Sequence, residues 1–130
     1  MKKIIYLNFF LFIFLLSPMS VDAKKIPNLI GKWEGENIKS TLKKGFLKSK
    51  NIIEITEQKN RLFKGYVIHK GGKEAFVGVI KSDHKTFYWA DSSDDDGKVI
   101  GTILKKNKIE TCYLDSGKDA VVGCSILFRE

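Results

Sequence analysis

Residues Ala75-Phe76-Val77-Gly78-Val79-Ile80 carry the pattern that decides the fold, a short aromatic and β-branched run with a glycine near its centre. The same arrangement recurs at residues 62–67, 99–103 and 121–126. A central glycine weakens a strand unless the sheet bends sharply there or another group approaches the backbone closely. Its repetition in strand after strand predicts a sheet that coils tightly on itself, which is a small barrel.

Around these runs, strand-like segments follow one another along the chain, and turn residues such as Gly71-Gly72 and Ser116-Gly117 separate most of them. Short, regular spacing predicts that successive strands pair antiparallel, as a meander. Eight strands can hide their edges by closing into a barrel or by stacking as a sandwich, and the central glycines favour closure. We therefore predict an all-β fold, an eight-stranded antiparallel meander closed into a small up-and-down β-barrel. The expected strands are 31–38, 50–57, 61–69, 73–81, 84–91, 97–105, 107–115 and 120–129.

The expected barrel interior is aromatic and β-branched, and a barrel of this size is filled by side chains or holds one small ligand. The candidate interior residues are Ile53, Ile55, Phe63, Phe76, Phe87, Trp89, Ile103 and Phe128. In the quoted run both faces are apolar, because Val77 and Val79 oppose Phe76 and Ile80. One face would then form an exposed apolar stripe, which suggests an oligomer contact.

The first 23 residues predict a secretory signal peptide. Lys2 and Lys3 form a positive start, residues 4–16 are apolar except for Asn8, and Val21-Asp22-Ala23 fits a signal-peptidase site. The apolar run is short for a membrane span, although an uncleaved N-terminal anchor is the alternative interpretation. We expect cleavage after Ala23, a secreted or periplasmic location, and a single barrel domain over residues 24–130 with no transmembrane segment.

The exported domain is expected to be basic. Removing Lys2, Lys3 and Asp22 from the 23 basic and 15 acidic residues leaves a net charge of +7. Such a charge either serves solubility alone or favours anionic partners such as glycans, lipid head groups and acidic proteins. We expect no nucleic-acid partner.

A lysine-rich segment spans residues 39–50 and could be a loop, a short helical turn or an irregular strand. Three apolar residues, Leu42, Phe46 and Leu47, lie among its lysines. Such a mixture can lie on an anionic glycan or lipid surface while the apolar residues dip in. The alternative is a solvated loop whose apolar residues cap the barrel mouth. The candidate ligand or partner contacts in this segment are Lys43, Lys44 and Lys48.

Two cysteines, Cys112 and Cys124, flank the turn sequence 115–119. A loop of residues 116–120 would place them directly opposite each other on neighbouring strands, so we predict a structural disulfide that closes a short loop. Glu110 shares a strand face with Cys112. If that face points inward, Glu110 is buried and needs a partner, such as a ligand donor or Arg129. If the face points outward, Glu110 is an ordinary surface residue, and the sequence leaves both possibilities open.

The two ends of the expected barrel carry a short motif. The first strand begins Gly31-Lys32-Trp33, and the last ends Leu127-Phe128-Arg129-Glu130. A G-x-W on the first strand with an arginine at the end of the last resembles the calycin barrels, the group of lipocalins and avidins. The resemblance implies that Trp33 closes the bottom of the barrel and that Arg129 packs across it in a cation–π contact. The length of the expected domain is closer to that of avidin-type barrels than to that of full lipocalins.

The resemblance covers the fold and does not extend to a ligand. Biotin sites of avidin-like barrels use several tryptophans and a polar cluster after the first-strand tryptophan. Here Trp89 is the only other tryptophan, and Trp33 is followed by Glu34-Gly35-Glu36-Asn37. Trp89 and Glu110 nevertheless remain candidate ligand contacts.

We expect no enzymatic activity, no cofactor and no metal site, because the sequence contains no nucleophile or phosphate-binding motif. The spacing of His69 and His84 predicts no metal site, and the acidic run 91–97 departs from EF-hand spacing. The sequence predicts a non-enzymatic binding module for a small apolar molecule or an anionic surface. Two alternatives stay open. One is a protein–protein interaction module, such as an inhibitor, an adhesin or a secreted effector, that uses the outer barrel surface. The other is a barrel isomerase of the allene oxide cyclase-like type.

Overall fold

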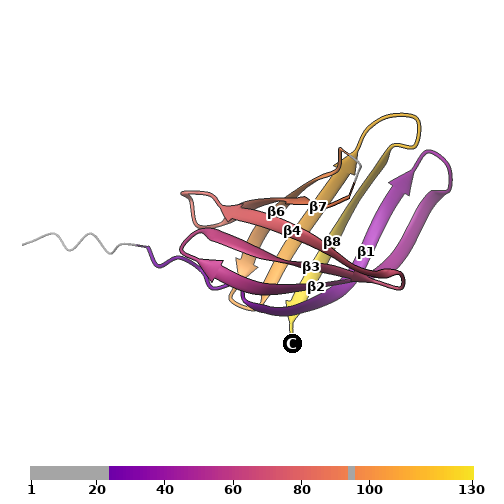
Figure 1. Ribbon diagram of the computed structural model, residues 1–130. Helices are drawn as coiled ribbons and strands as arrows, with labels where there is room; N and C mark the ends of the chain where they lie inside the picture. The colour runs from indigo at the N-terminus through magenta and orange to yellow at the C-terminus, as the bar shows by residue number, and fades with distance from the viewer. Residues whose placement is uncertain (1–23, 94–95) are drawn as a thin grey trace, which may run out of the picture.

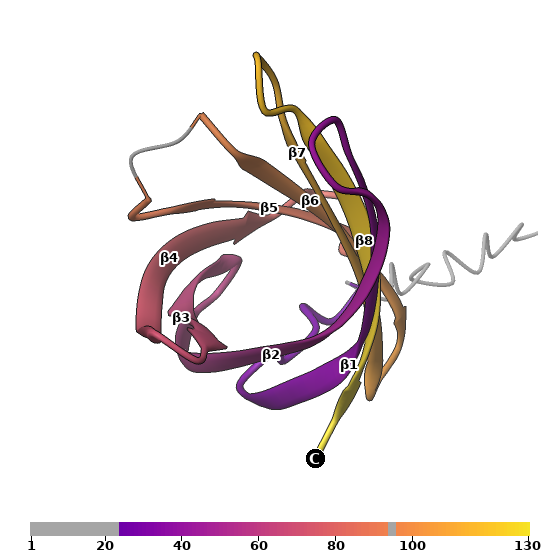
Figure 2. The same cartoon turned by 90° about the vertical axis from the view of Figure 1, so that its right-hand side faces the viewer.

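The computed structural model describes residues 24–93 and 96–130, and over this part of the chain it forms a closed antiparallel barrel of eight strands (Figure 1). Each strand pairs with the next along the chain, and β8 pairs with β1, so the ring has no open edge (Figure 2). The strands are β1 (Gly31–Thr41), β2 (Gly45–Lys59), β3 (Leu62–His69), β4 (Gly72–Ile80), β5 (Thr86–Asp91), β6 (Lys98–Lys105), β7 (Lys108–Asp115) and β8 (Val121–Arg129). The predicted fold class is confirmed.

Two predictions concern residues that lie outside the described part of the chain. The signal peptide falls on residues 1–23, and the acidic run 91–97 includes residues 94–95. Within the described residues, no helix has the length and apolar character that a membrane crossing requires.

The lysine-rich segment 39–50 consists of the end of β1, a tight turn and the start of β2. Thr41 pairs with Gly45 across the turn, and the ladder continues without interruption to Gly31 and Ile55. Gly45 has a φ of 69°, a left-handed conformation that favours glycine. The segment is therefore a regular hairpin, and its two strands extend beyond the predicted limits of 31–38 and 50–57. The polar residues of the segment hide the alternation of apolar and polar side chains that marks a strand.

The central glycines lie opposite aromatic residues. The cross-strand pairs are Gly65–Phe76, Gly78–Phe63, Gly101–Phe87 and Gly123–Tyr113. A Cβ atom added to Gly78 would lie 2.2 Å from the Phe63 ring, and one added to Gly101 would lie 2.0 Å from the Phe87 ring. The rings thus occupy the space that a side chain on the glycine would fill. Close approach, together with bending, explains why glycine recurs at these positions.

The buried apolar core fills one end of the barrel. Its members are Leu29, Trp33, Ile53, Ile55, Phe63, Phe76, Ile80, Phe87, Trp89, Val99, Ile109 and Leu127. Ile103 is partly buried and packs against this core, whereas Phe128 is 52% exposed, so its predicted place in the interior is wrong. The inward residues of β8 are Leu127 and Arg129, because Arg129 lies against Trp33, and alternation turns Phe128 outward.

The predicted disulfide between Cys112 and Cys124 is confirmed. The two residues are direct cross-strand partners on β7 and β8, with their Cα atoms 4.1 Å apart. Their neighbours Thr111 and Ser125 are buried, so alternation places the disulfide on the outer face of the barrel. Glu110 shares that outer face, which settles the alternative that the sequence left open.

Reduction of this disulfide should lower the free energy of unfolding by about 3 kcal/mol, because the bridge closes a short loop in the unfolded chain. Denaturant unfolding of the oxidised and reduced protein measures the difference, and the variant with both cysteines changed to alanine gives the same comparison without a reductant. Equal unfolding midpoints for the oxidised protein and the alanine variant would show that the disulfide does not contribute to the stability of the fold.

Candidate functional site

One end of the barrel is closed. The indole N–H of Trp33 donates a hydrogen bond of 2.9 Å to the Leu29 carbonyl, and the ring is fully buried. The Arg129 guanidinium carbon lies 4.4 Å from the centroid of the Trp33 ring, the contact that the resemblance implies. Arg129 also donates to the carbonyls of Ile30 and Asn28, and burial lowers the pKa of its guanidinium, which stays charged near neutral pH. A ligand must therefore enter from the other end.

The opposite end opens into a cavity of about 580 Å³ within the barrel. This volume lies in the range of ordinary small-molecule sites. Residues of all eight strands, some polar and some apolar, line this cavity, because the inward-facing rows that form the core at the closed end continue toward the open end. Its lining includes Asn37, Asn51, Trp89, Val99 and Tyr113.

A hydrogen-bonded network of amides and hydroxyls lies at the cavity wall, where β8, β1 and β2 meet. The Ser125 hydroxyl donates to the Asn37 side-chain carbonyl over 3.2 Å, and the Asn51 amide donates to the Ser125 hydroxyl over 3.0 Å. The Asn37 amide in turn donates to the Ser49 hydroxyl over 3.3 Å. Asn37 and Ser125 are buried, and their mutual hydrogen bonds offset the cost of burying polar groups. The network holds the amides in fixed orientations.

Trp89 lies at the inner end of the cavity and is only 6% exposed. Its ring stacks on Phe76 with centroids 4.5 Å apart, and it also stacks on Phe87. Its indole Nε1 is buried, and none of the described residues offers it a hydrogen-bond acceptor. A buried donor without an acceptor costs about 1–3 kcal/mol. The two tryptophans therefore differ in one respect: the Trp33 N–H is satisfied within the protein and the Trp89 N–H is not.

Charged residues of both signs surround the opening. Lys39, Lys43 and Lys44 come from the β1–β2 hairpin, and acidic residues come from β4, β5, the end of β7 and the β7–β8 loop. Lys43 Nζ lies 2.8 Å from a carboxylate oxygen of Asp119, so an exposed ion pair links the two loops at the opening. The acidic residues of the rim are Glu74, Asp91, Asp115 and Asp119.

The structure brings together some of the residues predicted as ligand contacts and separates others. Trp89 lines the cavity, and Lys43 and Lys44 lie at its rim. Lys48 lies on the exposed outer face, where it pairs with Glu36 at 3.1 Å, so it does not line the cavity. Glu110 also lies on the outer face and does not line it.

Sequence reasoning missed Asn37, Asn51 and Ser125. A signal was present, since Asn37, Asn51 and Ser125 each lie two or four residues along the strand from a buried apolar residue on the same face. These buried residues are Trp33, Ile53 and Leu127. That Asn37, Asn51 and Ser125 meet follows only from the register of β1 with β2 and of β1 with β8, which the structure shows.

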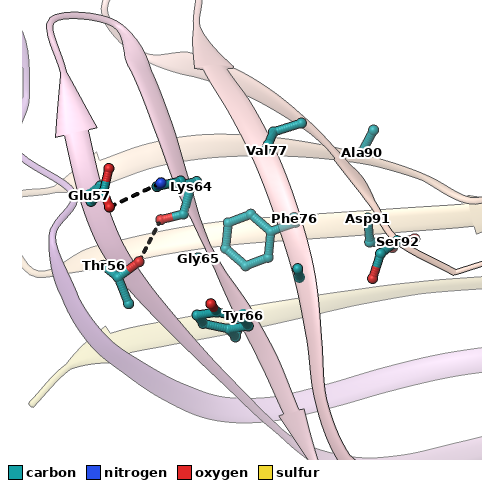
Figure 3. Close-up of a pocket in the computed structure, with 11 residues that line it drawn as sticks. Thr56, Glu57, Lys64, Gly65, Tyr66, Phe76, Val77, Ala90, Asp91 and Ser92 are labelled. Carbon is teal, nitrogen blue, oxygen red and sulfur yellow. Dashed lines mark hydrogen bonds and ion pairs between the residues drawn. The ribbon is translucent and has the colours of Figure 1, made fainter.

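A second, smaller pocket of about 310 Å³ lies across β2 to β5 (Figure 3). Some of its polar groups have partners within the protein: Lys64 pairs with Glu57 at 3.0 Å, and the Thr56 hydroxyl lies 3.5 Å from the Lys64 carbonyl. Val77, on its edge, is 64% exposed and belongs to the predicted outer apolar stripe. The mouth cavity, with its unsatisfied donor and fixed amides, is the stronger candidate site.

No protein-family model and no curated protein matches the sequence. Among solved structures, the barrel is similar to a redesigned β-barrel with a TM-score of 0.50 and 15% sequence identity. The match covers 78% of this chain and 91% of the other. At this identity the likeness shows the fold alone, and the chain is, on that ground, a small eight-stranded β-barrel.

Proposed function

We propose that this protein is a secreted or periplasmic, non-enzymatic barrel that binds a small, partly polar organic molecule in its mouth cavity. The observation that carries the proposal is that Trp89 lines the cavity and that its indole N–H is buried with no acceptor among the described residues. A ligand with a carbonyl or ring-nitrogen acceptor would satisfy this donor and offset the cost of burying it.

The lining supports a ligand with two kinds of surface. Trp89, Val99 and Tyr113 supply apolar and aromatic area, while Asn37 and Asn51 supply amide groups. Small-molecule sites commonly combine an apolar lining with a few placed polar groups. The fixed amides favour a planar or cyclic ligand with hydrogen-bonding groups over the wholly apolar molecule that the sequence suggested.

Two further observations support the other parts of the proposal. The groups of the wall network are amides and hydroxyls, which orient a ligand through hydrogen bonds and do not activate it, and this supports binding without catalysis. The disulfide on the outer face supports export, because such bridges form and persist in oxidising compartments.

Trp89→Phe tests the proposal, since phenylalanine keeps an aromatic ring and removes the N–H donor. Isothermal titration with small carbonyl and heteroaromatic compounds should give about tenfold weaker binding in the variant, the equivalent of one lost hydrogen bond. The matched control is Tyr66→Phe in the outer pocket of Figure 3, which should leave the affinity unchanged. Binding that is equal in wild type and Trp89→Phe, or that falls in Tyr66→Phe, would contradict the proposal.

A further inference from the structure

The tip of the β1–β2 hairpin exposes two large apolar side chains. Leu42, in the turn between the two strands, is 72% exposed, and Phe46, at the start of β2, is 91% exposed. On the outer face beside the tip, Phe46 lines an apolar groove with Ile38 and Val122, which are themselves about half exposed. Contiguous exposed apolar area of this kind commonly marks an interaction site.

The same hairpin carries a concentrated positive charge. Five lysines lie between Glu36 and Glu54, and that interval contains no acidic residue. Lys43 and Lys48 form ion pairs with Asp119 and Glu36, but all four side chains are mostly exposed. Exposed ion pairs contribute little, so an anionic partner can replace these carboxylates without a large cost.

The tip is held in place by contacts with its own turn and with the neighbouring loop. The Lys44 backbone N–H donates to the Thr41 hydroxyl over 2.8 Å. The Leu42 backbone N–H donates to the Ala120 carbonyl over 3.1 Å, and Lys43 pairs with Asp119. The hairpin tip and the β7–β8 loop lie side by side at the mouth end of the barrel (Figures 1 and 2). A preorganised tip loses little conformational entropy when it binds.

We propose that the hairpin tip docks on the surface of an anionic lipid bilayer. Leu42 and Phe46 enter the boundary between head groups and acyl chains, and the surrounding lysines contact the anionic head groups. Because Thr41, Lys43 and Lys44 also line the cavity, docking in this way turns the barrel mouth toward the membrane. The inference stands on the outer tip and does not depend on the ligand of the cavity.

The charge and the apolar residues together select this partner. A second copy of the chain would bring the same five lysines against the first, and like charges would repel. A sulfated glycan would pair with the lysines but would leave Leu42 and Phe46 in water. An anionic bilayer satisfies both features at once.

The test is sedimentation of the purified protein with vesicles that contain phosphatidylglycerol and with vesicles of phosphatidylcholine alone. The tip variant Phe46→Ser/Lys44→Gln is compared with Leu62→Ser/Lys59→Gln, which removes one exposed apolar residue and one lysine at the β2–β3 turn. All variants are expressed and purified in the same way, so any contribution of residues 1–23 to vesicle binding is equal among them. We expect retention on phosphatidylglycerol vesicles, at least about tenfold weaker in the tip variant, and unchanged in the control.

A fluorescence measurement separates insertion from adhesion by charge alone. The native Trp33 and Trp89 are both buried, so the emission of the new tryptophan in Phe46→Trp is obtained as the difference from wild type. This difference emission should shift to shorter wavelength when phosphatidylglycerol vesicles are added. Equal retention on both kinds of vesicle, an equal loss in the control, or no spectral shift would overturn the proposal. So would binding to heparin that requires Lys44 while Phe46→Ser leaves vesicle binding intact, because that result would identify a sulfated glycan as the partner.

Discussion

Trp33→Ala should destabilise the protein by about 3–5 kcal/mol, the range of a fully buried large aromatic residue replaced by alanine. Trp33 is completely buried and closes one end of the barrel. The change removes the indole ring, the hydrogen bond to Leu29 and the ring face on which Arg129 lies. Arg129 would then keep its charge beside a cavity, which adds to the cost.

Urea unfolding followed by circular dichroism measures this effect, because the second tryptophan complicates fluorescence. Trp33→Phe is the matched control: it keeps a ring under Arg129 and should cost clearly less than Trp33→Ala. A loss below about 1 kcal/mol for Trp33→Ala, the size of an exposed-site effect, would show that this ring does not close the barrel.

Gly101→Val should destabilise the barrel by more than about 3 kcal/mol, because overpacking forces side chains and backbone to shift in a rigid core. The added Cβ would lie 2.0 Å from the Phe87 ring, and Phe87 is fully buried. The ring can move aside only into space that Phe63 and Trp89 already occupy.

A double-mutant cycle isolates the cause. In a Phe87→Leu background, whose smaller side chain leaves room beside residue 101, the cost of Gly101→Val should be reduced. Thermal unfolding of the four proteins gives the coupling. An unchanged cost in the Phe87→Leu background would mean that strand bending, and not ring packing, explains the glycine.

The strand number, the antiparallel order and the closure could be predicted, because turn spacing and repeated glycines are local features of the sequence. The pairing of Cys112 with Cys124 could also be predicted, since a short turn fixes the register of the strands on either side. Phe128 lies on the outer face, although its hydrophobicity alone predicts a place in the core. The face of β8 is set instead by Arg129 against Trp33, a contact between the two ends of the chain.

The site was less predictable than the fold. Trp89 could be identified as a candidate because it is one of two tryptophans in the sequence. Whether its N–H finds an acceptor depends on where every neighbouring acceptor lies. Asn37 and Ser125 are far apart in sequence and become partners only when β8 closes onto β1. Lys48 and Glu110 look like contacts in sequence, yet strand alternation turns both away from the cavity. For Trp89, Asn37 and Ser125 the outcome depends on long-range register, which no local pattern contains. For Lys48 and Glu110 it depends on which face of the strand points inward.

The most direct test of the ligand site is an NMR spectrum of the two tryptophan indole N–H groups, recorded while small carbonyl and heteroaromatic compounds are added. The protein supplies its own reference, because the Trp33 N–H is bonded to Leu29 and the Trp89 N–H lacks an acceptor among the described residues. Compounds that bind should shift the Trp89 resonance downfield and slow its exchange with water, and should leave the Trp33 resonance in place. Binding that leaves the Trp89 resonance unmoved, with shifts confined to the outer barrel surface, would contradict the assignment of the mouth cavity as the site.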